Sequence, residues 1–193
     1  MYGLYALKPW YGHRLAGLRR VLIAHRVAPN AVTSAGVVFG AGAGLVLAVA
    51  PVGPWAAVVV AILLLARLGC ANLDGGLARA TGRGTRFGVV VNELGDRLAE
   101  LAALAGLFAL APPALVLGAA LATTAPSWVA LAGTAAFAPR SQGGPVGKTE
   151  RCALLVVIAA TGWVVPVVAV LIGGSVLTAG MRLHGLRRQL AAS

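Results

Sequence analysis

Three long segments of the chain contain no Asp, Glu, Lys or Arg: residues 27–66, 101–139 and 152–181. A helix that spans a bilayer needs about 20 predominantly apolar residues. The first two segments are long enough for two such helices each. Each is also interrupted near its middle by prolines, at 51–54 in the first and at 112–113 in the second. Because proline disfavours a helix interior, each segment is expected to form two helices.

The third segment is shorter, and Pro166 lies near its middle. It accommodates two helices only if the first of them begins early, near Lys148. The pattern therefore predicts an all-α, polytopic membrane protein with six transmembrane helices in one domain, residues 29–193. We expect these helices at residues 31–50, 54–74, 87–111, 113–136, 148–162 and 165–186.

The composition agrees with a membrane protein. Of the 193 residues, 59% are hydrophobic and only 11% are charged, whereas soluble domains have about 25% charged residues. A soluble enzyme and a disordered chain are both excluded by this shortage of charge. The two cysteines are too few for a disulfide framework.

The charged residues also predict an orientation. The 16 Lys and Arg outnumber the 5 Asp and Glu, giving a formal net charge of +11. In a soluble protein this excess would indicate binding to nucleic acid. Here the basic residues flank apolar segments, so we expect no nucleic-acid partner. With six spans, the uncharged connections near 51–54, 112–113 and 162–165 lie opposite both termini. The positive-inside rule then places both termini in the cytoplasm, and we expect a bacterial cytoplasmic membrane.

The first 28 residues form a basic segment ahead of the first span. Within residues 13–26, Leu15, Leu18 and Leu22 recur at helical spacing beside four arginines, Arg14, Arg19, Arg20 and Arg26. This pattern predicts an amphipathic helix lying on the cytoplasmic leaflet, with its basic groups near anionic lipids. A basic membrane-flanking segment without a specific partner is the alternative.

The acidic residues are concentrated in one region. Four of the five fall within 27 residues: Asp74, Glu93, Asp96 and Glu100. On a helix with about 100° per residue, Asn92 lies on the same face as the last three. Carboxylates inside membrane spans are rare and costly unless they are paired. A divalent cation, arginines or both are therefore expected to face them.

A turn at 82–84 sets the register of these acids. In an antiparallel helix pair joined there, Asp74 lies level with Asn92, and Ala71 lies level with Asp96, about 5–6 Å deeper. We expect one polar chamber that opens to the cytoplasm and is ringed by Arg67, Arg79, Arg83, Arg86 and Arg97. Carboxylates with arginines suit a metal-bridged phosphate or diphosphate. Salt bridges that only neutralise buried acids remain the alternative.

The residues of this region resemble a known signature. Asp74-Gly75-Gly76-Leu77-Ala78-Arg79 is followed, at the required spacings, by Gly88, Asn92 and Asp96. The run resembles D-x2-D-G-x2-A-R-x8-G-x3-D-x3-D of the CDP-alcohol phosphotransferase (CDP-alcohol phosphatidyltransferase) family. The six helices and the basic N-terminal segment also resemble this family.

The resemblance implies an enzyme of phospholipid synthesis. It would transfer a phospho-substituted group from a CDP-activated lipid to an alcohol acceptor and release CMP. Asp96 matches the catalytic general base that deprotonates the acceptor, while Lys148 and Arg151 would bind the acceptor's phosphate or headgroup. The residues implied to bind the nucleotide are Asp74, Gly75, Ala78, Arg79 and Gly88.

Two of the four signature aspartates are replaced. Ala71 stands at the first position and Asn92 at the third. The family uses two divalent ions, Mg²⁺ or Mn²⁺, whereas alanine offers no ligand and asparagine only a neutral carbonyl oxygen. We expect at most one ion, with a site that holds no ion as the alternative. The candidate metal ligands are Asp74, Asp96 and Asn92, with Glu93 and Glu100 as possible substitutes.

These replacements leave two other functions open. One is a non-catalytic relative that binds nucleotide or lipid, and the other is a membrane enzyme acting on another diphosphate, such as a prenyl diphosphate. Besides substrates and membrane lipids, a second copy of the chain is a possible partner. Small residues at Gly36, Gly40 and Gly44 offer a face for packing a homodimer.

Overall fold

The computed structural model describes residues 14–141 and 143–191, and these residues contain helices but no strands. The helices are α2 (Ala16–Ala24), α3 (Pro29–Val49), α4 (Pro54–Thr81), α5 (Arg86–Ala105), α6 (Pro113–Ala135), α7 (Lys148–Thr161) and α8 (Val164–Ala191), and a 3₁₀ turn, η2 (Gly106–Ala109), follows α5. Proline is at or next to the first position of α3, α4 and α6, where its missing N–H costs nothing. Left-handed glycines, Gly82 and Gly162, end α4 and α7.

Helices α3–α8 correspond to the six that the apolar pattern predicts. The predicted ends at 74 and 186 are wrong, because α4 continues to Thr81 and α8 to Ala191. The apolar pattern shows where the membrane ends, and a helix can extend beyond that point. The predicted N-terminal helix is α2, while residues 1–13 lie outside the described part.

Four helices are long and apolar enough to cross a membrane: α3, α4, α6 and α8. The other two helices of the bundle do not meet this description. Helix α5 contains five charged residues. The 14 residues of α7 extend only about 21 Å at 1.5 Å per residue, less than the ~30 Å of a hydrocarbon core. The chain is an integral membrane protein, and its six-span count stays a prediction.

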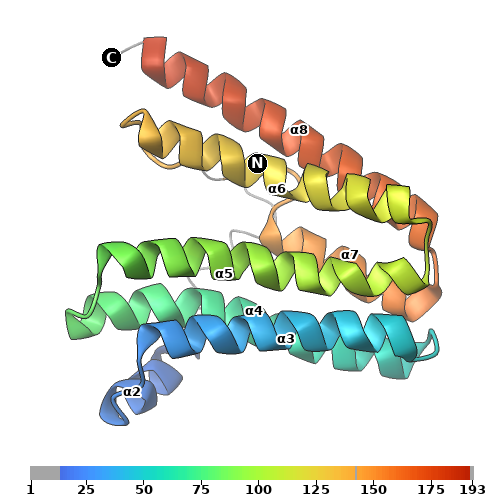
Figure 1. Cartoon of the computed structure of the whole chain (residues 1–193), viewed down its shortest axis with the longest axis horizontal. Helices are drawn as coiled ribbons and strands as arrows, with labels where there is room; N and C mark the ends of the chain where they lie inside the picture. The colour runs from blue at the N-terminus through green and yellow to red at the C-terminus, as the bar shows by residue number, and fades with distance from the viewer. Residues whose placement is uncertain (1–13, 142, 192–193) are drawn as a thin grey trace.

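The helices form two groups (Figure 1). Helices α3, α4 and α5 lie side by side, α6 lies along α8, and α7 contacts both α4 and α8. The connections after α3, η2 and α7 lie at one end of the bundle, and the α4–α5 turn and the last turn of α8 lie at the other. This alternation agrees with the arrangement predicted for an even number of helices.

Glycines bring α3 and α5 into close contact. A Cβ added at Gly40 would lie 2.3 Å from the carbonyl oxygen of Ala99, and one at Gly44 would lie 2.2 Å from that of Ala102. Gly36 faces Cys70 of α4. These glycines pack inside the chain, so the expectation that they form a dimer face is wrong. A homodimer as such stays a prediction.

Helix α2 lies against the end of α4 that is nearest the acidic residues. Its flanking Leu15 and its Leu22 pack on the buried Leu73 and Leu77 of α4. On the same side, Arg83 of the α4–α5 turn donates to the carbonyl oxygen of Arg26 at 3.1 Å. These contacts position α2 at one end of the bundle, as an interfacial helix requires.

Candidate active site

Two adjoining cavities lie at the end of the bundle where the acidic residues gather. The larger, which we call the chamber, has a volume of about 370 Å³ and lies between α4, α5 and the segment that joins α6 to α7. The smaller, of about 210 Å³, extends toward the start of α3 and the α4–α5 turn. Residues shared by both cavities include Asp74, Gly75, Arg79, Asn92 and Glu93.

The predicted register of α4 and α5 is confirmed. Asn92 lies beside the carboxylate of Asp74. Ala71 and Asp96 border one small common space. The turn at 82–84 therefore brings the two remaining aspartates of the signature into the same chamber.

Asp74 is held by neutral donors. Its Oδ1 accepts from the N–H of Gly75 at 2.6 Å, and its Oδ2 accepts from Oγ1 of Thr33 at 3.0 Å. The residue is 4% exposed. In the described part of the chain, no Lys, Arg or His forms a salt bridge with it. Within residues 14–141 and 143–191, Asp74 is thus a buried carboxylate that is positioned by hydrogen bonds from neutral groups and not by a salt bridge.

Asp96 is bound to a cation. Nζ of Lys148, at the start of α7, lies 2.5 Å from Oδ2 of Asp96. Arg67 of α4 donates to the backbone carbonyl oxygen of Asp96 at 3.1 Å. Arg67 is 3% exposed, so it lies beneath the chamber and does not belong to the predicted ring of arginines.

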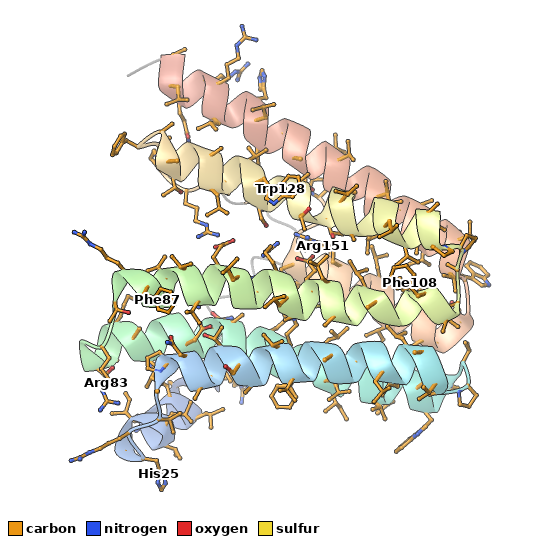
Figure 2. All side chains as sticks on the ribbon, in the orientation of Figure 1. His25, Arg83, Phe87, Phe108, Trp128 and Arg151 are labelled. Carbon is orange, nitrogen blue, oxygen red and sulfur yellow. The ribbon has the colours of Figure 1, made fainter. Side chains whose placement is uncertain are left out.

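Glu100 lies in a buried ion cluster. Its carboxylate accepts from Arg97 at 2.9 Å and from Arg151 of α7. Arg151 also donates to the carbonyl oxygen of Thr123, which joins α7 to α6, and Figure 2 shows its side chain in the space between α5 and α6. Glu100 does not line the chamber. Glu100 is therefore not placed where it could replace a lost metal ligand.

Glu93 joins α5 to the connection between α6 and α7. Its Oε2 lies 2.6 Å from Arg140, and its Oε1 lies 4.0 Å from Arg97. Glu93 lines the chamber, but its charge is balanced by these arginines. It is better placed to hold the connecting segment over the chamber than to bind an ion.

Several chamber residues are not identified by the sequence reasoning. Arg140, Ser141, Gly143 and Gly144 of the connecting segment, together with Arg182 of α8, line the chamber. Arg182 donates at 2.9 Å to the carbonyl oxygens of Gly143 and of Pro126 in α6. The sequence indicates these residues only through one basic residue in the connection and another in the last helix. Basic residues commonly flank membrane helices, and that role explains both equally well.

The remaining candidates are near the smaller cavity. Ala78 and Gly88 line it together with Arg83. Gly88 is in the first turn of α5, where its N–H donates to Oγ1 of the N-cap residue Thr85 at 2.9 Å. Arg86, which we expect in the ring, is not among the residues lining either cavity.

The family model described as CDP-alcohol phosphatidyltransferase matches residues 26–181 of this chain. The chain belongs to that family. This family assignment covers all the residues of both cavities except Arg182.

Two relatives are similar to most of this chain. The chain is 33% identical over 177 residues to the phosphatidylinositol phosphate synthase of Mycolicibacterium smegmatis, covering 82% of this chain and 77% of the relative. It is 30% identical over 150 residues to inner membrane protein YnbA of Escherichia coli, covering 77% and 74%.

Solved structures share the fold. The phosphatidylinositol phosphate synthase PgsA1 of Mycobacterium tuberculosis with bound CDP-DAG superimposes with a TM-score of 0.65 at 24% identity, covering 88% of this chain and 92% of the other. The same protein with manganese and citrate gives a TM-score of 0.64 at 25% identity, covering 89% and 88%.

Together these findings define the activity in general terms. The chain is an enzyme of a divalent-metal-dependent CDP-alcohol phosphatidyltransferase family, whose members transfer a phospho-substituted group from a CDP-activated lipid and act in phospholipid synthesis.

Proposed function

We propose that this chain transfers the phosphatidyl group of CDP-diacylglycerol to an alcohol that carries a phosphate of its own, and releases CMP. The acceptor oxygen bonds to the phosphorus attached to the lipid, and the bond from that phosphorus to the oxygen of CMP breaks. Asp96 takes the proton of the acceptor hydroxyl. The observation that carries this proposal is that the family signature folds around one chamber in which Asp74 and Asp96 lie together.

The nucleotide binds in the smaller cavity and at its junction with the chamber. Gly75 and Ala78 on α4 and Gly88 on α5 have small side chains or none, which lets a bound nucleotide approach both helices closely. Arg79 lines both cavities, so its guanidinium is placed to meet the diphosphate. Asp74 lies at the same junction, where it would hold a divalent ion that binds the diphosphate of the nucleotide.

The donor atoms fit one divalent ion. Asp74 and Asp96 supply carboxylate oxygens, and Asn92 adds a carbonyl oxygen, all lining the chamber. In the part of the chain that the structure describes, the hydrogen bonds to Asp74 come from neutral donors, which leaves its charge for a cation. Among the described residues, no three His, Cys, Asp or Glu come together as a metal cluster. One Mg²⁺ or Mn²⁺, completed by phosphate oxygens and water, suits this set and would neutralise charge on the diphosphate.

The opposite side of the chamber supports an anionic acceptor. Arg140, Lys148 and Arg182 all line it, on the connecting segment, α7 and α8. Arg151, which the sequence reasoning groups with Lys148, is committed to Glu100 and holds the start of α7 instead. An acceptor that carries a phosphate is also implied by the name of the M. smegmatis relative.

The proposal includes an arrangement in the membrane. Helices α5 and α7 complete six spans, residues 29–193 form one transferase domain, and α2 belongs to an interfacial segment ahead of it. Both termini and the chamber face the cytoplasm of a bacterial membrane. The uncharged connections after α3, η2 and α7 support this orientation.

The test is CMP release by the purified full chain with CDP-diacylglycerol and Mn²⁺ or Mg²⁺. We expect CMP with phosphorylated acceptors such as inositol phosphate or glycerol phosphate, little with inositol, glycerol or serine, and none after chelation with EDTA. CMP release with unphosphorylated alcohols only would overturn the acceptor assignment. Asp96→Asn serves as the inactive control.

The replacement of two aspartates by Ala71 and Asn92 favours a binding-only relative as the second candidate. This candidate predicts that CDP binds to the chain while no acceptor yields CMP. Inorganic diphosphate released from a prenyl diphosphate would instead indicate the other class of enzyme. The three functions therefore differ in their products.

A further inference from the structure

Helix α3 holds together the two helices that carry the aspartates of the site. Asp74 is on α4 and Asp96 is on α5. Each of these helices packs along α3, whereas α4 and α5 contact each other much less. The position of one carboxylate relative to the other therefore depends on the side chains of α3 that contact both helices.

Thr33, in the second turn of α3, contacts both helices at the level of the site. The residue is 7% exposed, and it lines one small space together with Asp74, Gly95 and Asp96. Its hydroxyl donates to Oδ2 of Asp74 at 3.0 Å. Its methyl group lies against Gly95 of α5, where an added Cβ would be 2.4 Å from Cγ2 of Thr33. One side chain thus contacts Asp74 and the residue that directly precedes Asp96.

The hydroxyl of Thr33 lies closer to Asp74 than to the backbone of its own helix. A threonine hydroxyl inside a helix commonly donates to the carbonyl oxygen four residues earlier. Here that oxygen belongs to Pro29 and is 3.4 Å away, whereas the carboxylate oxygen is at 3.0 Å. A hydrogen bond to a charged acceptor is also the stronger one. Because a hydroxyl has one hydrogen, it goes to Asp74.

The methyl group of Thr33 fixes the direction of this hydroxyl. Threonine is branched at Cβ, so its hydroxyl and its methyl group turn together about one bond. While the methyl group lies against Gly95, the hydroxyl faces α4. Valine would keep the methyl contact and lose the donor, and serine would keep the donor and lose the methyl contact. Substitution can therefore separate the two contacts.

We propose that Thr33 is a positioning residue for the metal site. Its hydroxyl orients the carboxylate of Asp74 for the divalent ion, and its methyl group maintains the spacing of α5, which carries Asp96, from α4. The proposal rests on the ion of the proposed function. An ionised carboxylate has about four acceptor positions, so Asp74 can accept from Thr33 and still bind an ion.

The test measures Mn²⁺ binding to the purified full chain in the presence of CDP, by electron paramagnetic resonance of the free ion. Thr33→Val should raise the Kd for Mn²⁺ about 10–100-fold, the usual effect of losing a hydrogen-bond partner of a metal ligand. CMP release at saturating Mn²⁺ should stay close to the parent's, because Asp96 keeps its carboxylate. Thr33→Ser keeps the donor and should bind Mn²⁺ nearly as tightly as the parent. A purely structural role would lower the thermal midpoint and leave the Kd unchanged.

Thr124→Val is the matched control for loss of a buried threonine hydroxyl. Thr124 is also 7% exposed, and its hydroxyl donates to the carbonyl oxygen of Leu121 in its own helix, α6. Its replacement should leave the Kd for Mn²⁺ unchanged.

Gly95→Ala tests the methyl contact, because the added Cβ meets Cγ2 of Thr33. It should weaken Mn²⁺ binding in the parent. Combined with Thr33→Ser, which lacks that methyl group, it should weaken binding much less.

An unchanged Kd in Thr33→Val overturns the proposal, and so does an equal rise in Thr33→Ser. If the valine variant does not fold, Gly95→Ala decides, because equal losses of affinity with threonine and with serine at position 33 also overturn the proposal. CMP release by the parent separates this inference from the proposed function. CMP release together with an unchanged Kd in Thr33→Val contradicts this inference alone, whereas the expected rise in Kd without CMP release contradicts the function alone.

Discussion

Replacing Glu100 by glutamine should destabilise the protein without weakening metal binding. Glu100 is 6% exposed and accepts from Arg97 and from Arg151, whose side chain is also 6% exposed. Removing one partner of a buried ion pair typically costs about 3–5 kcal/mol, because the other charge is left uncompensated. Arg151 keeps hydrogen bonds to the carbonyl oxygens of Thr123 and Gly147, and Arg97 keeps Glu93 at 4.0 Å. We therefore expect a loss near the lower limit, about 3 kcal/mol.

The assay is unfolding of the full chain in detergent, by denaturant or heat, beside a titration with Mn²⁺ and CDP. Glu93→Gln is the control, because its short ion pair is with Arg140, which is 47% exposed, and its contact with Arg97 is longer, at 4.0 Å. A pair with an exposed cation contributes about 0–1 kcal/mol. If Glu100→Gln unfolds like the parent but loses Mn²⁺ affinity, Glu100 is a metal ligand and the ion cluster described here is wrong. Equal losses of stability in the two variants would show that burial does not set the strength of these pairs.

Three further predictions concern the site and the packing. Asp96→Asn should lower turnover by about 10²–10⁴-fold and keep most of the affinity for CDP, because the amide cannot accept a proton. Asp74→Asn should instead weaken the binding of CDP with Mn²⁺. Equal effects of the two variants on turnover and on CDP binding would contradict these separate roles. Arg182→Gln should raise the KM for a phosphorylated acceptor more than it changes the KM for CDP-diacylglycerol, and the reverse order would place Arg182 on the donor side. Gly44→Val should destabilise the chain by about 1–3 kcal/mol because its side chain meets the backbone of α5, whereas Gly173→Ala, which meets nothing within 4 Å, should leave the thermal midpoint within a few degrees of the parent's.

The local features of this protein are determined by its sequence. Apolar segments interrupted by proline predict helices beginning at residues 54, 113 and 148, and the structure begins α4, α6 and α7 at these positions. The turn at 82–84 and the helical rise suffice to place Asp74 beside Asn92 and Ala71 near Asp96. Such predictions succeed because helix periodicity and a short turn depend on neighbouring residues only.

The partners of the charged groups are decided by the tertiary structure. Lys148 meets Asp96, Arg140 meets Glu93 and Arg151 meets Glu100 across 47–52 positions of the chain. A charge pattern shows that buried acids need cations, but not which of sixteen basic residues supplies each one. That choice depends on how α7 and the connecting segment pack against α5, and packing of this kind arises from the shapes of many distant side chains together. It decides that Glu100 stabilises the bundle and that Lys148 is in the chamber.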